Sequence, residues 1–144
     1  MKELIIFCGM ILVISIPIAL VCMLIHELGH LLVNRQLGIL ADKNIRFSRE
    51  HFALYVSVDH RKLLALPKEK QILSFASGMI ANIIAAAISL LLAFAFAFAK
   101  ILPLTAFVLW LFGIANLVSI VAGIVGKKSD MKRIMQLERG ETLT

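Results

Sequence analysis

Three long apolar runs dominate the chain. They cover about residues 4–33, 72–99 and 104–125, and the second and third are closed by Lys100 and by Lys127 with Lys128. A helix needs about 20 mainly apolar residues to cross the roughly 30 Å hydrocarbon core of a bilayer. The pattern therefore predicts an all-α membrane protein with three transmembrane helices. Because the first two runs are longer than required, we expect tilted helices or a kink at Pro17.

A different pattern occupies part of the segment 34–71 between the first two runs. Phe52–Val58 alternates apolar residues with smaller or more polar ones, which is the period of a β-strand. Ile45–Ser48 is its expected partner, with Arg49-Glu50-His51 as the turn. The sequence thus predicts a small membrane-associated β-hairpin. Its edge either pairs with an extended peptide or lies on the membrane interface as a shield.

Composition supports a single membrane unit. The chain has 144 residues, of which 60% are hydrophobic and 17% charged, and its mean hydropathy is +0.94. A typical soluble domain is about 45–50% apolar and about 25% charged. The apolar content also excludes a disordered chain. We expect one integral membrane core over residues 1–144, without a second domain.

The basic residues are distributed unequally between the two expected sides of the membrane. Segment 34–71 carries eight Lys and Arg and the tail 127–144 carries five, whereas the opposite side has only Lys2 and Lys100. Under the positive-inside rule this places the loop and the C-terminal tail in the cytoplasm and the N-terminus outside the cell membrane. Cytoplasmic flanks account for the net charge of +6, so we expect no nucleic-acid partner.

The first run ends in a motif that can carry chemistry, His26-Glu27-Leu28-Gly29-His30. Residues i and i+4 share one face of a helix, so both imidazoles can reach one metal ion. Glu27 lies where it can take a proton from a metal-bound water, as in zinc hydrolases. Gly29 removes a side chain beside the motif and would let another segment approach closely.

Three ionisable residues within an apolar span are costly. Insertion scales assign at least about 2.5–3.5 kcal/mol to one charged group near the bilayer centre, and such residues are usually functional. The alternative is a polar patch that only holds helices together. A bound metal would make the burial tolerable, which favours the metal interpretation.

Further residues add a family resemblance. The HELGH sequence in a first transmembrane helix, Ser77-Gly78-Met79-Ile80-Ala81-Asn82 in the second run, and Asn116 followed by Asp130-Met131 resemble the motifs of the site-2 protease family in their order along the chain. Members of that family are intramembrane zinc metalloproteases with a three-helix core. Met79 and Met131 stand where the family usually has Pro and Gly, and the spacing from Asn116 to Asp130 is longer than in the common form.

The resemblance implies a minimal three-helix protease with one zinc ion per chain. It implies Glu27 as the catalytic base, His26, His30 and Asp130 as metal ligands, and Gly78, Asn82 and Asn116 as groups that contact the substrate or the oxyanion. The expected partners are the lipid bilayer and a transmembrane or signal-peptide-like peptide, cleaved near the cytoplasmic face.

Depth along the expected helices agrees with a shared site for three of these residues. His26, Asn82 and Asn116 lie about 10, 15 and 14 Å from the inner ends of their spans. The two Asn residues alternatively bond neighbouring helices together.

Asp130 is the open position in the metal site. On a straight helix it would lie about 21 Å below Asn116, so it reaches the metal only if the chain turns back, which Gly123 and Gly126 permit. The alternative is that Ser129 or Asp130 caps a short tail helix, 131–139, ended by Gly140. The first loop supplies the fallback ligands Asp42, His51, Asp59 and His60.

Two other functions stay open at the level of sequence. One is a catalytically inactive membrane binding or immunity protein that keeps the protease shape; the intact HExxH motif argues against it. The other is a membrane zinc protease whose motif lies in the cytosol. The apolar run that leads directly into His26 argues against that arrangement.

Overall fold

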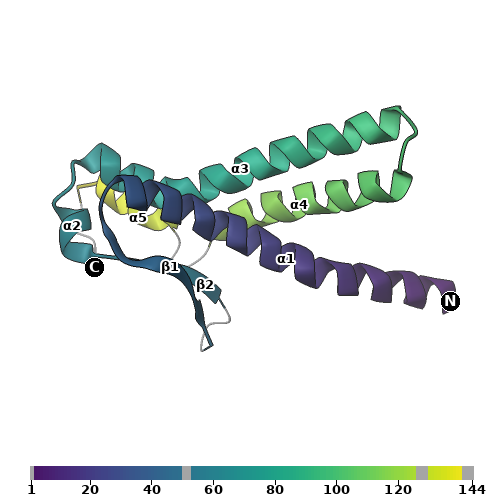
Figure 1. The fold of residues 1–144 in the computed structure, drawn as a ribbon, viewed down its shortest axis with the longest axis horizontal. Coiled ribbons are helices and arrows are strands. Elements are labelled where there is room, and N and C mark those ends of the chain that lie inside the picture. Colours follow the sequence, from purple (N-terminus) through teal and green to yellow (C-terminus); the bar gives the residue numbers. More distant parts are fainter. Residues whose placement is uncertain (1, 50–52, 126–129, 141–144) are drawn as a thin grey trace.

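The computed structural model describes residues 2–49, 53–125 and 130–140. Most of these residues are helical, and two strands form a small sheet (Figure 1). The elements in chain order are α1 (Lys2–Gln36), β1 (Leu40–Ser48), β2 (Ala53–Val58), α2 (His60–Leu64), α3 (Lys68–Phe98), α4 (Pro103–Val125) and α5 (Asp130–Glu138).

Three of the helices are long and apolar enough to cross a membrane. They cover Ile11–Gln36, Lys68–Phe98 and Pro103–Ala122, which confirms the three apolar runs as helices. α1 continues through Pro17 as one helix. The coarse fold class, three candidate membrane helices with a two-stranded sheet between the first and second, agrees with the prediction from the sequence.

α3 and α4 form an antiparallel hairpin, and α1 lies against it only through its C-terminal half (Figure 1). The N-terminal half of α1 diverges, and its Leu12 and Ile16 are 68% and 59% exposed. α1 and α3 approach each other closely at Gly29, where an added Cβ would lie 2.5 Å from the Ser77 carbonyl oxygen of α3. The absence of a side chain at Gly29 therefore allows α1 and α3 to touch, as expected.

α1 ends in a turn that directs the chain back along it. Gly38 has a φ of +69°, a left-handed conformation that Gly adopts without strain and that commonly terminates helices. The Ile39 N–H donates to the Asn34 carbonyl oxygen at 3.1 Å, which completes the turn. The reversal places the hairpin beside the last turns of α1.

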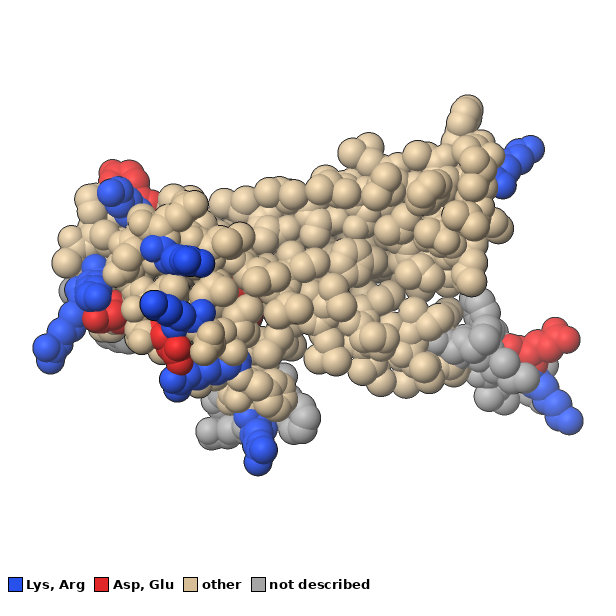
Figure 2. All heavy atoms as spheres, viewed as in Figure 1, with Lys and Arg blue, Asp and Glu red and all other residues tan. Residues whose placement is uncertain are grey.

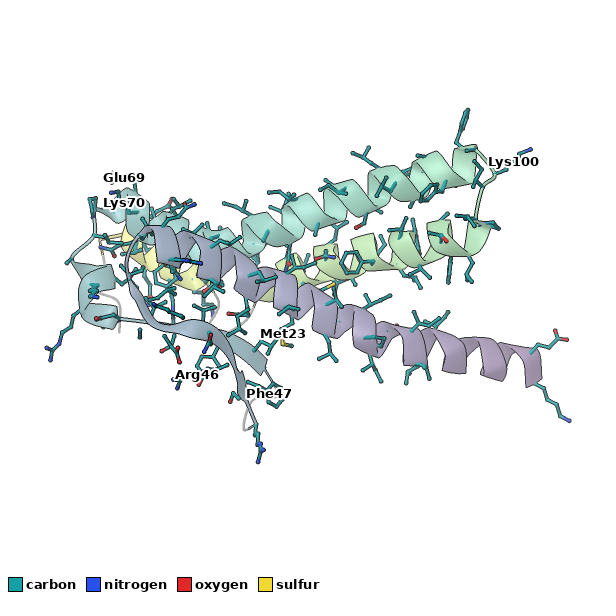
Figure 3. All side chains as sticks on the ribbon, in the orientation of Figure 1. Met23, Arg46, Phe47, Glu69, Lys70 and Lys100 are labelled. Atoms are coloured by element: carbon teal, nitrogen blue, oxygen red, sulfur yellow. The ribbon has the colours of Figure 1, made fainter. Side chains whose placement is uncertain are left out.

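The predicted hairpin is present and is longer than expected. β1 begins at Leu40 rather than at Ile45 and pairs antiparallel with β2 in the register Ile45↔Val56, with an irregularity between Leu40 and Ile45. The Leu54 N–H of β2 donates to the Met23 thioether of α1 at 3.2 Å, and Figure 3 shows Met23 directed toward the hairpin. Glu50, His51 and Phe52, part of the predicted turn and strand, lie outside the described residues.

The end of the molecule that carries β1, β2, α2 and α5 is termed here the basic end. Figure 2 shows Lys and Arg gathered on it, with an uncharged surface along the three long helices. A small apolar core made by Ile39, Leu63, Phe75 and Ile134 joins the turn before β1 to α2, α3 and α5 there. Lys100 lies at the opposite end (Figure 3). The charge asymmetry read from the sequence is thus also a spatial one.

Candidate metal centre

The two imidazoles of the HExxH motif converge on one point with a carboxylate. His26 and His30 lie one turn apart on α1, and their Nε2 atoms are 3.2 Å apart. The Asp130 Oδ2 atom lies 3.1 Å from the His30 Nε2 and 3.4 Å from the His26 Nε2. One ligand atom from each residue falls within 4.8 Å of the others. This His26–His30–Asp130 triad could hold a metal ion.

Asp130 reaches the triad because the chain folds back after α4. It is the first residue of α5, which packs along α3 at the basic end. The predicted tail helix also forms, since α5 ends at Glu138 and is followed by Gly140 with a φ of +73°. Asp130 therefore begins the helix as its first residue, and its carboxylate faces the imidazoles. Ser129 and Gly126 lie outside the described residues.

The environment of Asp130 keeps it ionised. Burial raises the pKa of its carboxyl, but hydrogen bonds and charges from His26 and His30 outweigh burial and leave the pKa well below its usual range. A carboxylate is the form that binds a metal ion. The two imidazoles thus favour the ionised form of Asp130, which is the form that binds a metal ion, also in the metal-free protein.

Ile134 holds α5 against the rest of the basic end. It is 7% exposed and packs with Leu63 and Phe75, and it lies one turn beyond Asp130. Replacement by Ala removes most of this contact, so we expect Ile134→Ala to lower metal affinity about tenfold by loosening the third ligand. Zinc competition with a chromophoric chelator measures the effect. Met135→Ala, on the exposed side of α5, is the matched control; equal losses in both variants would contradict the prediction.

The non-ligating nitrogen of His30 is held by α3. Its Nδ1 lies 2.9 Å from the Ser74 carbonyl oxygen and 3.0 Å from the Ser77 hydroxyl. The Ser74 hydroxyl in turn donates to the Asn34 Oδ1 at 2.6 Å. A carbonyl partner on Nδ1 fixes the tautomer that leaves Nε2 free to bind a metal. These polar groups therefore orient His30 for coordination.

Asn82 contacts the other imidazole. It is 1% exposed, and its side-chain amide lies 3.4 Å from the His26 Nδ1. The Asn82 Oδ1 has no hydrogen-bond partner in the described part of the chain. Because the two ends of an amide are interchangeable by rotation, the Oδ1 can accept from the Nδ1–H and orient His26. Asn82 is thus beside the candidate ligands, as the sequence suggested.

Asn116 is placed differently. It is fully buried, but its amide donates to the Phe112 carbonyl oxygen of its own helix at 2.9 Å. Its Oδ1 has no hydrogen-bond partner among the described residues. The structure assigns it no hydrogen bond to the triad.

Gly78 provides room for the imidazoles. A Cβ added there would lie 2.5 Å from the His30 Nε2 and 2.6 Å from the His26 Nε2, closer than real Cβ contacts allow. The two atoms that would bind the metal therefore face the bare backbone of α3. This steric role was not apparent from the motif, which suggested contact with substrate.

The fallback ligands have other positions. The Asp42 carboxylate pairs with Arg46 on β1, which lowers the pKa of Asp42. Asp59 caps α2 by accepting from the Arg61 and Lys62 N–H groups. His60 lines the cavity beside the triad but does not belong to it. His51 lies outside the described residues.

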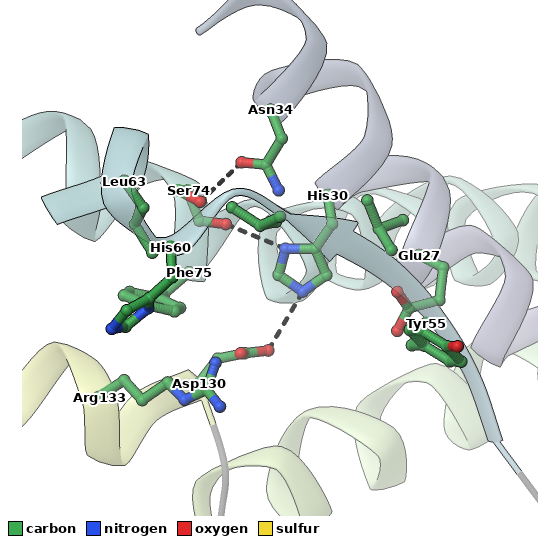
Figure 4. Close-up of a pocket in the computed structure, with 12 residues that line it drawn as sticks. Glu27, His30, Asn34, Tyr55, His60, Leu63, Ser74, Phe75, Asp130 and Arg133 are labelled. Atoms are coloured by element: carbon green, nitrogen blue, oxygen red, sulfur yellow. Dashed lines mark hydrogen bonds and ion pairs between the residues drawn. The ribbon is translucent and has the colours of Figure 1, made fainter. Parts of the chain in front are cut away.

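A cavity of about 310 Å³ opens beside the triad at the basic end (Figure 4). The walls come from α1, β2, α2, α3 and α5. Glu27 lies in it together with Val56 of β2, whose N–H faces the Glu27 carboxylate. The lining residues are Glu27, His30, Asn34, Tyr55, Val56, Val58, His60, Leu63, Ser74, Phe75, Asp130 and Arg133. The cavity therefore contains the Glu27 carboxylate, candidate metal ligands and residues of the strand β2.

Some residues of the site were not anticipated from the sequence. Asn34 continues the i, i+4 series of His26 and His30 on α1, so the helical period was a usable signal. Ser74 and Ser77 begin a polar stripe along α3 that a helical plot of the second run would have revealed. Arg133 gave no signal, because it is one of several basic residues in the tail.

Comparison of the chain with protein-family models, curated proteins and solved structures found no match. The functional interpretation therefore depends on the geometry of the site and on the sequence motifs.

Proposed function

We propose that the chain is an intramembrane zinc endopeptidase of the site-2 protease type. The observation that supports this most directly is the convergence of the His26, His30 and Asp130 ligand atoms in a cavity that also contains Glu27. Two imidazoles and a carboxylate are a usual donor set for catalytic zinc, with a fourth position left for water. The donors fit the ion. The Nδ1 atoms of His26 and His30 are hydrogen-bonded to groups of α3, and their Nε2 atoms face one another.

Each of these residues of the cavity would have a separate role in peptide hydrolysis. Zinc, when bound, supplies a Lewis acid that polarises the scissile carbonyl and acidifies a water molecule. Glu27 takes the proton from that water and passes it to the leaving amine. The Val56 N–H faces the Glu27 carboxylate from β2. His26 and His30 are held in place by Asn82 and Ser74.

The edge of β2 supports an extended substrate. The Leu54 and Val56 N–H groups point away from β1 toward Met23 and Glu27 of α1. A thioether is a weak acceptor, so a substrate carbonyl can replace Met23 as the partner of Leu54. An extended peptide would then pair with β2 and present its backbone to the triad. A helical segment must unwind first, because its carbonyls are engaged within the helix.

The distribution of charge supports an orientation in the cell membrane. We place the basic end and the C-terminus in the cytoplasm and the N-terminus outside, in line with the positive-inside rule. Cleavage would then fall near the cytoplasmic face of the bilayer. The substrate class is a transmembrane or signal-peptide-like peptide.

Zinc per chain, determined by elemental mass spectrometry on detergent-purified protein, tests the proposal. We expect about one zinc in the wild type and loss of zinc from His26→Ala and Asp130→Ala, since each removes one of the ligands. His60→Ala is the matched control, because this imidazole lines the cavity outside the triad.

Three results would change the conclusion. Zinc retained by Asp130→Ala would move the third ligand elsewhere. Equal loss of zinc from His60→Ala would place the metal outside the triad. A wild type without zinc after reconstitution would remove the protease function and favour a non-catalytic membrane binding protein.

A further inference from the structure

The cavity contains one charged group that peptide hydrolysis does not use, Arg133. It lies on α5 three residues after Asp130, so both side chains are on the same face of that helix. Figure 4 shows the two side chains directed into the cavity beside each other. The guanidinium lies 5.4 Å from the centre of the Phe75 ring. Phe75 thus lies within cation–π distance of the Arg133 charge.

The donors of Arg133 are available to a ligand. Within the described part of the chain, the guanidinium forms no ion pair with a carboxylate. A cation–π contact with a ring uses the charge of a guanidinium and does not require its N–H donors. Arg133 is also solvent-exposed and lines the cavity. A fork of N–H donors in this state is suited to bidentate binding of a carboxylate.

The charges around the cavity also favour an anion. A divalent metal in the triad would be offset by the carboxylates of Asp130 and Glu27, both within the site. Arg133 then leaves one positive charge without an internal partner among the residues described. A neutral peptide would leave this charge unmatched beside a largely apolar wall of Val58, Leu63 and Phe75.

We propose that Arg133 binds a carboxylate of the substrate close to the scissile bond and so makes the enzyme selective for an acidic peptide. This inference rests on the proposed function, because it places the substrate backbone at the triad. Three residues along a helix span about 4.5 Å, and an extended peptide advances about 3.3 Å per residue. The carboxylate therefore belongs to a residue close to the scissile bond.

Two kinds of peptide carry such a carboxylate. One has an Asp or Glu side chain at that position, and the other ends there with its free C-terminus. The chemistry at Arg133 is the same in both. Peptides with an internal Asp and an amidated end, and peptides with a free acid end and no Asp, distinguish the two sources.

Binding of fluorescent peptides to full-length, zinc-supplied Glu27→Gln protein in detergent tests the inference without turnover. The probe is an apolar Leu/Ala peptide in which Asp is moved stepwise through the central segment, each peptide being paired with its Asn twin. We expect at least one Asp position, or the free-acid end, to bind about tenfold more tightly than its neutral twin. Arg133→Gln should abolish this preference, and Arg133→Glu should invert it toward a Lys twin.

Arg61→Gln is the matched control, since it removes one positive charge from α2 at the same end of the molecule. It should keep the preference for the carboxylate. Equal binding of the twins, no binding of either, or a preference that persists in Arg133→Gln would overturn the inference.

Cleavage of the same peptides by wild-type protein separates this inference from the proposed function. If the acidic peptide and its neutral twin are cleaved equally and cleavage requires Glu27, the protease function is supported and the role of Arg133 is excluded. If no peptide is cleaved while an Arg133-dependent preference in binding is seen, the carboxylate site stands and the protease fails.

Discussion

Replacement of Glu27 by Gln should abolish peptide hydrolysis while the metal stays bound. Glu27 lies in the cavity beside the triad but is not one of its three candidate ligands. Gln keeps the size of the side chain and its contact with the Val56 N–H, but it cannot accept the proton of the attacking water. Loss of a general base costs about 10²–10⁴-fold in rate, so we expect a fall in cleavage of that order.

Two measurements on the same preparation check this result: zinc per chain, and the rate of cleavage of a model transmembrane peptide. Glu69→Gln makes the same chemical change on the exposed first turn of α3 (Figure 3) and should leave both unchanged. A Glu27→Gln protein with the full rate would exclude Glu27 as the base. A variant that loses its zinc would instead make Glu27 part of the coordination.

The second large effect is expected from a single methyl group. In Gly78→Ala the new Cβ would lie 2.5 Å from the His30 Nε2 and 2.6 Å from the His26 Nε2. The clash involves two imidazoles whose Nδ1 atoms are already hydrogen-bonded to α3. Neither ring can therefore move away without losing that hydrogen bond. We expect zinc affinity to fall by about 10–100-fold, and hydrolysis to fall with it.

Competition with a chelator measures the affinity, and circular dichroism reports whether the helices persist. Gly9→Ala is the matched control, because a Cβ at that position of α1 meets nothing within 4 Å. Unchanged zinc affinity in Gly78→Ala would show that the imidazoles bind the metal in another arrangement.

Much of the framework could be predicted because it depends on local periods. Continuous apolar runs predicted the three long helices, and the spacing of His26 and His30 predicted a shared face. Alternation over Val56 and its neighbours predicted the hairpin. Each of these features is set by residues a few positions apart, where helix and strand geometry apply directly.

The remainder depends on contacts between distant segments. Nothing local to Asp130 indicates that α5 folds back, since its position comes from the packing of Ile134 against Leu63 and Phe75. A straight continuation of α4 would have carried Asp130 away from the imidazoles. The steric role of Gly78 was hidden for the same reason, because it exists only where α1 crosses α3.

The triad joins two positions that are 100 residues apart, His30 and Asp130. During biosynthesis α1 and its imidazoles emerge first, and the carboxylate follows only after α3 and α4 have been made. Until then a nascent chain offers a metal two nitrogen ligands, fewer than the three that a catalytic zinc site uses. The proposed hydrolytic site is therefore incomplete until α5 has been made, and this timing is a consequence of the order of the elements along the chain.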